Sequence, residues 1–492
     1  MLTEDVAMTN LRVSKLFVFL LAMVVVAASC GSDSAELTAS RDEVVVLRAT
    51  ALSTPAEVFA AVSPSVVFVE VPDNSGSGVL LSSGYVITNA HIVGHFPTVR
   101  LVTSAGELAE VPVYAKDWST DLAVIGPLPF DELDGEISAV DLGSSATVNI
   151  GDAVYLIGYP GEVESHPVPA MTSGILSRRR LAHCLGMTFL QTDAVIAGGQ
   201  SGGVLVDASG QVIGISGLGA FADSNFALVL AVEDVVAALE GLDEGSGNLV
   251  TVEGSGALKQ TTEVAIYDSA GYLVTITEDQ PSLSVTAKSP DGEDVWLDIS
   301  TWDGYDPLWH HSQDEVDYIY ESGEHETDLF YADAFEDETS ESLEVSLKPG
   351  MYVVSTGTYS GKTTTIVVEA SSPLKLLEDA EPSRRRLAIG ESVTGLLSHF
   401  EDLDSYRIDL QKGDAVRIQA ASLADPVMSL YLDDELVASS DDAGIGLYGD
   451  GAEIVFEAQV TGEYVLEVME FRGEFKAYFL SVDHADTRNP SC

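Results

Sequence analysis

The chain has 492 residues, 46% of them hydrophobic, and its 43 glycines and 18 prolines are too few for a disordered or collagen-like chain. At about 150 residues per domain, this length predicts roughly three folded units. The 78 acidic residues exceed the 23 basic ones and give a formal net charge of −55, which argues against nucleic acid as a partner because its phosphates carry the same sign. We interpret this charge as a solvated surface suited to a salty exterior.

The N-terminal segment is predicted to direct export. Arg12 and Lys15 precede an apolar run of 13 residues from Leu16 to Ala28, which is shorter than the ~20 residues that a membrane-spanning helix needs. A basic start followed by a short apolar run is typical of a secretory signal peptide, here residues 1–29. The protein is therefore expected to be exported.

Cys30 follows this run in the segment AASCG, which resembles a bacterial lipobox. In a lipobox the cysteine sulfur is acylated and anchors the protein to a membrane, and residues 30–51 would then form a polar tether. The usual large aliphatic residue three positions before the cysteine is alanine here, so cleavage after Ser29 by the ordinary signal peptidase is the alternative. Both interpretations predict an exported protein of the bacterial cell envelope, either lipid-anchored to a membrane or cell surface, or periplasmic or secreted.

From Val58 to about Leu239, short runs of Val, Ile, Leu and Tyr alternate with turns of Gly, Ser and Asp. Many short strands separated by turn signals predict a β-barrel or sandwich rather than a parallel α/β sheet. The segment VEDVVAAL, residues 232–239, is predicted to close this unit as a short amphipathic helix.

Three short segments in this region carry the residue types of nucleophilic catalysis. GYVITNAHIV contains His91, DWSTDLAVI contains Asp121 and AGGQSGGVLV contains Ser201. A serine hydroxyl is a weak nucleophile at neutral pH, so it needs a base within reach and a third group that orients the base. The order His, Asp, Ser is that of a chymotrypsin-like serine peptidase, with Ser201 as nucleophile, His91 as base and Asp121 as the group that holds the imidazole. The structural alternatives are a packed histidine, an aspartate that caps a turn, and a serine in a glycine-rich turn.

The motifs around these residues resemble, in order, those of the HtrA (Deg) peptidases, a branch of the trypsin-like superfamily. They are GSGVLLSSGYVITNAHIV, DLAVI, NIGDAVYLIGYPG, MTSGILS and QTDAVIAGGQSGGVLVDASGQVIGI, and the resemblance covers roughly residues 52–243. It implies an all-β peptidase domain of two six-stranded barrels, and a serine endopeptidase that hydrolyses unfolded or exposed polypeptides through an acyl-enzyme. Relatives are often trimers built through the segment before the first barrel, here residues 56–71, so the resemblance also implies a homotrimer.

The resemblance places the oxyanion hole at the backbone amides of Gly199 and Ser201. The loop departs from the family, because the usual Pro and Asn before the nucleophile are Gly198 and Gln200, and a Pro after the twin glycines is Val204. Glycine releases a backbone constraint. We therefore expect the resting loop to sample inactive conformers until a substrate orders it.

The specificity pocket is predicted from the position six residues before the nucleophile. Val195 occupies this position with Ile196 beside it, and Ile215, Ser216 and Gly217 form the predicted wall. No acidic residue lies at the base of such a pocket, so we expect small aliphatic side chains, rather than Lys or Arg, before the scissile bond.

The C-terminal half departs from the HtrA family, whose members normally carry PDZ domains after the peptidase. No PDZ segment is found after the glycine-rich linker at residues 244–248. Two β-rich segments follow instead, and a motif with Gly350 and Tyr352 recurs 112 residues later with Gly462 and Tyr464. The repeat predicts a duplicated β-sandwich of about 100 residues.

The two predicted sandwiches span residues 252–371 and 384–485. The second resembles the bacterial pre-peptidase C-terminal domain, and the first is a diverged copy. That resemblance implies a binding or secretion accessory without catalytic residues. A surface binding protein, in which the sandwiches carry the function and the peptidase fold is inactive, is therefore the alternative to an active enzyme.

No cofactor and no metal site are predicted. Calcium requires six to eight converging oxygens, and aspartates are abundant in the loops of any acidic protein, so a structural calcium is only the alternative. Three histidines lack the spacing of metal ligands. The residues considered are Asp402, Asp404, Asp433, Asp434, Asp441, Asp442, Asp450, His310, His311 and His325.

Two further features stay open in the sequence. If Cys30 is acylated, Cys184 and Cys492 either form a disulfide or remain thiols. The motif SRRRLA occurs at Ser177 and at Ser383. The first copy is predicted to offer arginines to an acidic partner or to pair internally, and the second to be a solvated basic stretch rather than a processing site.

Overall fold

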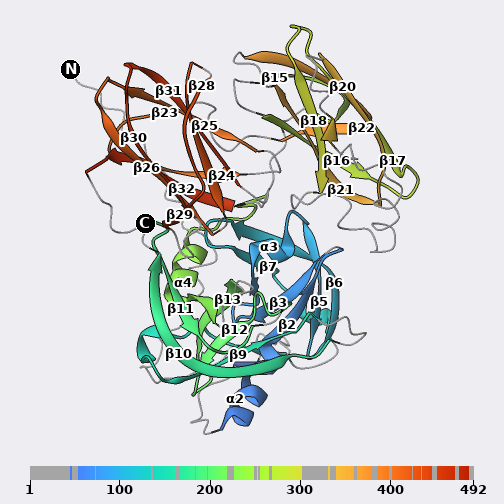
Figure 1. The fold of residues 1–492 in the computed structure, drawn as a ribbon. Coiled ribbons are helices and arrows are strands. Elements are labelled where there is room, and N and C mark those ends of the chain that lie inside the picture. The colour runs from blue at the N-terminus through green and yellow to red at the C-terminus, as the bar shows by residue number, and fades with distance from the viewer. Residues whose placement is uncertain are drawn as a thin grey trace, which may run out of the picture. The chain divides into compact units, whose positions relative to one another are not determined.

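The computed structural model shows two compact units, one of residues 1–117, 122–179 and 189–247 and one of residues 118–121, 180–188 and 248–492 (Figure 1). The predicted signal peptide, Cys30, Cys492 and the three histidines considered above lie outside the described residues. The described residues are 45–46 and 54–486, except 73, 134–136, 162–166, 183, 197, 219–225, 249–251, 253–254, 265–268, 302–330, 333–338, 359–362, 378–384, 398–401, 424, 434, 446–450 and 471–475.

The first unit contains two closed barrels, each of six antiparallel strands. Barrel 1 has the strand order β2-β3-β4-β7-β6-β5, and barrel 2 has the order β10-β11-β14-β13-β12-β9. The strands of barrel 1 are β2 (Val66–Glu70), β3 (Ser75–Leu80), β4 (Val86–Thr88), β5 (Thr98–Thr103), β6 (Gly106–Asp117) and β7 (Leu122–Ile125). Those of barrel 2 are β9 (Ala153–Gly158), β10 (Ala170–Ala182), β11 (Met187–Thr192), β12 (Val204–Asp207), β13 (Val212–Leu218) and β14 (Ala227–Ala231).

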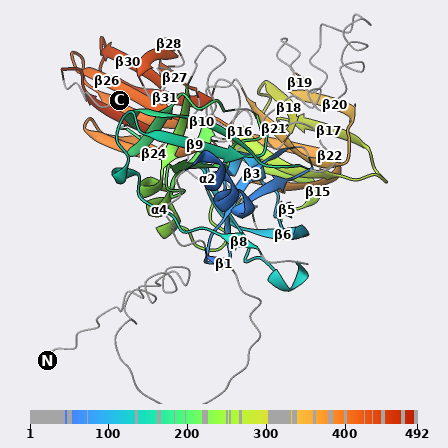
Figure 2. The same ribbon diagram turned by 90° about the horizontal axis from the view of Figure 1, so that it is seen from below.

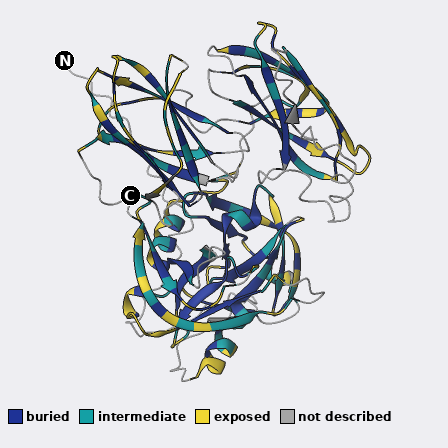
Figure 3. Ribbon diagram, viewed as in Figure 1, coloured by how far each residue is buried: buried dark blue, intermediate teal, exposed yellow. Residues whose placement is uncertain are grey.

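Buried aliphatic residues form the core of each barrel, and Figure 3 colours many residues of the barrel strands as buried. Strand β6 alternates buried and exposed residues over most of its length, whereas all four residues of β7 are buried. Val, Ile and Leu fit such a pleated, half-buried surface. The predicted class, an all-β double barrel of the trypsin type, is confirmed.

Helices and short turns lie at the ends of these strands. Helix α2 (Pro55–Val62) begins with a capping box in which Thr54 and Glu57 bond reciprocally. A one-turn helix, α3 (Ala90–Val93), follows β4, and α4 (Val232–Glu240) is the helix predicted at the end of the domain. The remaining short elements are η1 (Ser63–Ser65), η2 (Phe130–Glu132), η3 (Ser145–Thr147) and the pair β1 (Val45–Val46) and β8 (Ser138–Ala139) (Figure 2).

The predicted linker is not a free tether at its start. The Gly245 amide donates to the Tyr114 carbonyl at 2.8 Å, and the Lys116 amide donates to the Ser246 carbonyl at 2.8 Å. Gly245 and Ser246 therefore bond to the end of β6, the strand that leads to Asp121.

The first C-terminal segment forms one eight-stranded sheet around a single aliphatic core. Strand β22 belongs to both halves of this sheet: it pairs with β15 and β17 over most of its length, and its end at Lys375 and Leu376 pairs with β16. Pro373, which has no amide to donate, precedes that switch. The strands are β15 (Ala257–Val264), β16 (Ser269–Ile276), β17 (Ser282–Lys288), β18 (Val295–Thr301), β19 (Tyr331–Ala332), β20 (Ser340–Ser346), β21 (Gly350–Thr358) and β22 (Thr364–Leu376).

The second C-terminal segment has two five-stranded sheets whose inner faces share one core. One sheet has the order β23-β25-β31-β27-β28 and the other β24-β32-β26-β30-β29. The strands are β23 (Arg385–Leu387), β24 (Glu391–Leu397), β25 (Asp404–Leu410), β26 (Ala415–Ser422), β27 (Pro426–Leu432), β28 (Glu435–Ser440), β29 (Asp442–Ile445), β30 (Gly451–Glu457), β31 (Gly462–Glu470) and β32 (Lys476–His484).

The repeated glycine-tyrosine motif has the same structure in both segments. The Tyr352 hydroxyl donates to the Lys348 carbonyl at 3.0 Å, and the Tyr464 hydroxyl donates to the Val460 carbonyl at 2.9 Å. Each tyrosine is buried and bonds four residues upstream, which resembles the tyrosine corner of β-sandwich domains. The sequence repeat is therefore also a structural repeat at this point.

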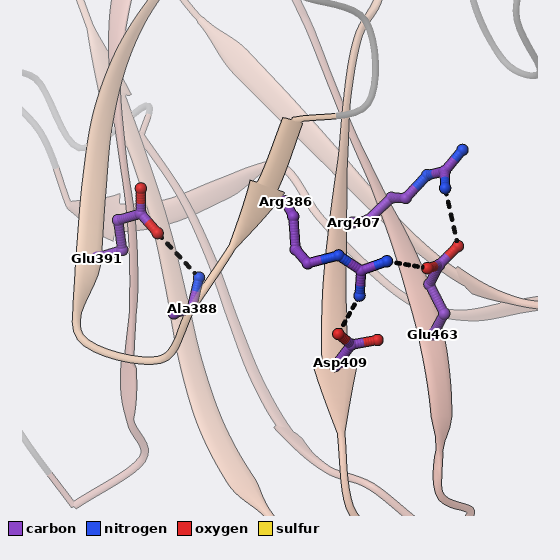
Figure 4. Close-up of polar contacts among 6 residues, drawn as sticks. All are labelled: Arg386, Ala388, Glu391, Arg407, Asp409 and Glu463. Carbon is purple, nitrogen blue, oxygen red and sulfur yellow. Dashed lines mark hydrogen bonds and ion pairs between the residues drawn. The ribbon is translucent and has the colours of Figure 1, made fainter.

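Each SRRRLA motif has an arginine that bonds within its own domain. In the first copy, Arg179 donates to the Ser145 hydroxyl and to the Val148 carbonyl, each at 2.9 Å. In the second copy, Arg386 donates to Asp409 and, at 2.6 Å, to Glu463 (Figure 4). Such exposed ion pairs contribute little to stability.

Candidate active site

His91 lies in the one-turn helix at the end of barrel 1. Strand β4 ends at Thr88, Asn89 is the N-cap residue, and α3 follows at once. The side-chain amide of Asn74 donates to the His91 carbonyl at 3.0 Å. This bond ties the helix to the loop before β3 and leaves the half-buried imidazole at the rim of the barrel.

Asp121 immediately precedes β7 and is only 3% exposed. Its φ of 55° is in the left-handed region, which aspartate and asparagine tolerate better than most residues. Strands β4 and β7 are antiparallel, with Thr88 opposite Ala123. Because His91 comes three residues after Thr88 and Asp121 two residues before Ala123, both belong to the same end of this strand pair.

Ser201 lies in the loop between β11 and β12 of barrel 2, and this loop meets barrel 1 at the GSG motif of β3. The Ser77 amide donates to the Ser201 carbonyl at 2.7 Å. A Cβ on Gly76 would lie 2.7 Å from Cδ1 of Ile92 and 3.1 Å from the Ser201 carbonyl oxygen. The residue after His91 and the predicted nucleophile therefore pack on the same glycine, which has no room for a side chain.

The four backbone carbonyls of the loop from Gly198 to Ser201 each accept a hydrogen bond. Two of the donors come from Ser77, one from its hydroxyl and one from its amide, and the others are amides of glycines. The bonds are Gly161 N to Gly198 O at 2.5 Å, Ser77 Oγ to Gly199 O at 2.8 Å, Gly203 N to Gln200 O at 3.0 Å and Ser77 N to Ser201 O at 2.7 Å.

These anchors fix the directions of the two amides predicted to form the oxyanion hole. A trans peptide is planar, so each N–H points opposite to the carbonyl of the preceding residue. The amides of Gly199 and Ser201 therefore point away from the anchors that hold the carbonyls of Gly198 and Gln200. Within the described part of the chain, neither amide donates a hydrogen bond, and two backbone donors remain for an anionic oxygen.

The first two predicted pocket residues differ in burial. Val195 is 69% exposed, and its carbonyl accepts a hydrogen bond from the Thr172 hydroxyl at 2.7 Å. Ile196 is partly buried against the core of barrel 2. The two therefore do not point into one common environment, and their role as a pocket base stays a prediction.

The predicted pocket wall lies on β13, directly against the nucleophile loop. Ile215 and Ser216 are buried. The Ser216 carbonyl accepts from the Gly202 amide at 2.7 Å, and its amide donates to the Gly203 carbonyl at 2.8 Å. Gly217, the next residue, follows on the same strand. The predicted wall therefore lies beside the nucleophile loop, and its pocket function stays a prediction.

Lys116 is a buried charged group near the site that sequence reasoning missed. It is 2% exposed, and its Nζ donates at 2.9 Å to the carbonyl of Gly94, which ends the helix that carries His91. Burial lowers the pKa of Lys116 from 10.5 to about 8. The neighbouring His95 is also buried, and burial and the Lys116 charge lower the pKa of its imidazole well below 6.5. His95 is therefore neutral over the pH range in which Lys116 titrates.

We expect Lys116 to make the stability of the protein depend on alkaline pH. Because its pKa is lower in the folded state than in the unfolded state, the folded state is penalised fully below pH 8 and progressively less toward pH 10.5. Relative to Lys116→Met, the wild type should gain at most about 3 kcal/mol in free energy of unfolding between about pH 7 and pH 10.5. Urea unfolding of both proteins across this range measures the difference, and parallel curves would contradict a lowered pKa.

Gly202 is predicted to be indispensable for the loop. Its φ is 79°, and a Cβ there would lie 1.9 Å from the Ser77 carbonyl oxygen. We expect Gly202→Ala to cost on the order of 2 kcal/mol from backbone strain alone, with displacement of β3 in addition. Thermal unfolding measures the loss, and Gly151→Ala is the control, since φ is also positive there but a Cβ meets nothing within 4 Å. Equal losses in the two variants would show that the contact with Ser77 is unimportant.

Three further predictions concern a metal site, the disulfide and a membrane span. Among the described residues, no group of three or more His, Cys, Asp or Glu side chains could hold a metal ion. Cys184 is disulfide-bonded, and its partner lies outside the described residues. No helix in the described part of the chain has the length and hydropathy to span a membrane.

The barrel region is similar to trypsin-like peptidase domains and to HtrA-type proteases. Residues 76–215 match the family described as a trypsin-like peptidase domain. Serine protease HTRA4 of Mus musculus is 34% identical over 191 residues, which are 35% of this chain and 38% of the relative. Serine endoprotease DegS of Haemophilus influenzae is 33% identical over 151 residues, which are 30% of this chain and 42% of the relative.

The matching solved structures include an HtrA-type protease, AlgW, with a tripeptide, at 28% identity and a TM-score of 0.34, covering 38% of this chain and 63% of that one. The serine endoprotease from Yersinia pestis matches at 27% identity and a TM-score of 0.33, covering 38% of this chain and 66% of that one. The chain spans about two fifths of the length of the curated relatives it matches.

Proposed function

We propose that this protein is an exported serine endopeptidase whose catalytic triad is His91, Asp121 and Ser201. The observation that carries the proposal is the loop before the nucleophile, where every carbonyl from Gly198 to Ser201 is bonded while the amides of Gly199 and Ser201 donate to no described residue. Backbone donors aimed at developing negative charge are usually the largest single contribution to acyl transfer.

In the proposed reaction, Ser201 Oγ attacks the scissile carbonyl while His91 takes its proton, and the resulting oxyanion binds to the amides of Gly199 and Ser201. His91 then gives the proton to the leaving amine, the C–N bond breaks, and an acyl-enzyme remains on Ser201. A water molecule attacks this ester with His91 as base, and the proton returns to Ser201 as the acid product leaves. Asp121 keeps the imidazole in the required tautomer and stabilises its positive charge.

The proposed substrates are unfolded or exposed polypeptides with a small aliphatic residue before the scissile bond. The support for this preference is the apolar character of Val195, Ile196 and Ile215, together with the buried position of Ile215 beside the nucleophile loop. The expectation that Gly198 loosens the loop stays a prediction, although in the structure its carbonyl is bonded to Gly161.

The proposed location is the bacterial cell envelope, with Cys30 as a lipid anchor and cleavage after Ser29 without acylation as the alternative. A homotrimer is proposed as the assembly. The C-terminal segments, of which the second resembles the pre-peptidase C-terminal domain, are proposed to act as binding or secretion accessories in the place that PDZ domains occupy in HtrA peptidases.

The decisive experiment uses the full chain with a fluorophosphonate probe and with casein as an unfolded substrate. We expect covalent labelling in which the Ser201 oxygen bonds to the phosphorus of the probe and displaces fluoride, with the labelled peptide mapping to Ser201 by mass spectrometry. We also expect casein cleavage that the probe blocks, with Val, Ala or similar residues before the mapped cut positions. Absence of both labelling and cleavage would overturn the proposal and favour a surface binding protein with an inactive peptidase fold.

A further inference from the structure

We infer that Ser77, in β3 of barrel 1, is a positioning residue that sets the geometry of the oxyanion loop in barrel 2, an inference that rests on the proposed function. Ser77 is fully buried. It touches the loop twice, since its hydroxyl donates to the Gly199 carbonyl and its amide donates to the Ser201 carbonyl. One residue therefore holds the carbonyls of both residues whose amides are predicted to bind the oxyanion.

The Ser77 hydroxyl has a defined direction because it both accepts and donates a hydrogen bond. It accepts a hydrogen bond from the Tyr159 amide at 2.7 Å and donates one to the Gly199 carbonyl at 2.8 Å. The amide can only donate and the carbonyl can only accept, so the bridging group must do both, as a hydroxyl does. Alanine in this position would leave the buried N–H of Tyr159 and the partly buried C=O of Gly199 without this partner.

The Ser77 backbone is itself held in place, so the bridge is rigid. The Thr88 hydroxyl donates to the Ser77 carbonyl at 2.6 Å. Thr88 ends β4, the strand that leads to His91, and Tyr159 directly follows β9 of barrel 2. The bonds of Ser77 thus connect the strand before the predicted base, a strand of the second barrel and the nucleophile loop.

The peptide that Ser77 holds lies between the two donor peptides. The Gly199 amide belongs to the peptide of residues 198–199 and the Ser201 amide to the peptide of residues 200–201. The Ser77 hydroxyl fixes the carbonyl of the intervening peptide, 199–200. The carbonyls of the two donor peptides keep their own bonds to the amides of Gly161 and Gly203 when Ser77 is changed. The Ser77 bond restrains the peptide that links them, and since Gly199 has no side chain to restrict rotation, losing this bond changes the orientation of the two donor amides relative to each other.

A transition-state effect distinguishes this role from a merely structural one. Donors that act on the oxyanion stabilise the transition state more than the bound substrate, so Ser77→Ala should lower kcat with little change in KM. Removing one oxyanion donor typically costs ~100 to 1,000-fold in kcat. Because Ser77 acts through the loop rather than directly, we expect a loss on the order of 10 to 100-fold.

The test compares the wild type with Ser77→Ala, Ser77→Thr and Ser65→Ala in the full chain, using a fluorogenic peptide taken from a mapped casein cut. Ser65 is the matched control, because it is also a fully buried serine of this domain whose hydroxyl donates to a backbone carbonyl, that of Val62, at 2.6 Å. Thermal unfolding measures stability, and affinities are measured for a peptide boronate, which forms a tetrahedral adduct with the serine, and for the matching product peptide.

We expect kcat and the boronate affinity of Ser77→Ala to fall by similar factors, while its affinity for the product peptide stays the same. At comparable stability, kcat should fall far more in Ser77→Ala than in Ser65→Ala. Ser77→Thr, which keeps the hydroxyl, should recover part of kcat. An unchanged kcat in Ser77→Ala, or equal losses of boronate and product affinity, would overturn the inference. A wild type that cleaves neither casein nor the peptide would instead overturn the proposed function.

Discussion

Ser201→Ala is expected to lower kcat for peptide hydrolysis on the order of a millionfold, which is the size of effect that removal of the nucleophile has in a serine peptidase. The residual rate should come from binding and from the amides of Gly199 and Ser201, which the substitution leaves in the backbone. The measurement is a single-turnover or long-incubation assay with the mapped peptide, together with fluorophosphonate labelling. Ser209→Ala is the matched control, since Ser209 is an exposed serine in the turn after β12 and bonds only locally with Asp207.

His91→Ala and the double variant with Ser201→Ala test whether the two residues act together. If His91 only activates Ser201, the loss in His91→Ala should be about as large as in Ser201→Ala, and combining the two should add almost nothing. Independent contributions would instead multiply in the double variant. The two residues would not act in one catalytic step if their losses in kcat multiplied in the double variant. The same conclusion would follow if Ser201→Ala retained more than about one hundredth of the wild-type kcat.

The apolar runs between turn residues were sufficient to predict many short strands in a barrel or sandwich, and the resemblance to the HtrA peptidases specified two six-stranded barrels. The sequence was also sufficient to select His91, Asp121 and Ser201 as candidates, since each lies at the end of such a strand or in the glycine-rich loop beside one. The register of β4 and β7 is consistent with the prediction for the first two residues.

The sequence could not reveal Lys116 or the bridge at Ser77. The register of β6 against β7 shifts between Val113 and Ala115, and such a bulge breaks the alternation from which the direction of a side chain is inferred. Ser77 stands in a motif whose glycines explain close packing, and its hydrogen bonds reach residues 82 and 122 positions away. Contacts at such separation depend on the tertiary arrangement of two barrels and leave no local signal.

Asp121→Asn is expected to lower kcat about ten-thousandfold while the fold is kept. An asparagine amide donates to the imidazole nitrogen that should carry a proton, so it favours the wrong tautomer of His91 and no longer stabilises the imidazolium. The substitution suits this position because the φ of Asp121 is 55°, and asparagine tolerates the left-handed region whereas alanine would add strain. The melting temperature should therefore change little, and kcat of the mapped peptide measures the catalytic loss.

Asp117→Asn is the control for this prediction, because Asp117 ends β6 only four residues earlier. Both variants remove one negative charge between the end of β6 and the start of β7, so a general electrostatic effect on substrate binding should appear equally in both. A specific loss in Asp121→Asn alone assigns the carboxylate to the imidazole. If Asp121→Asn kept more than about a tenth of the wild-type kcat, His91 would have to be oriented by another group, and the proposed triad would be wrong.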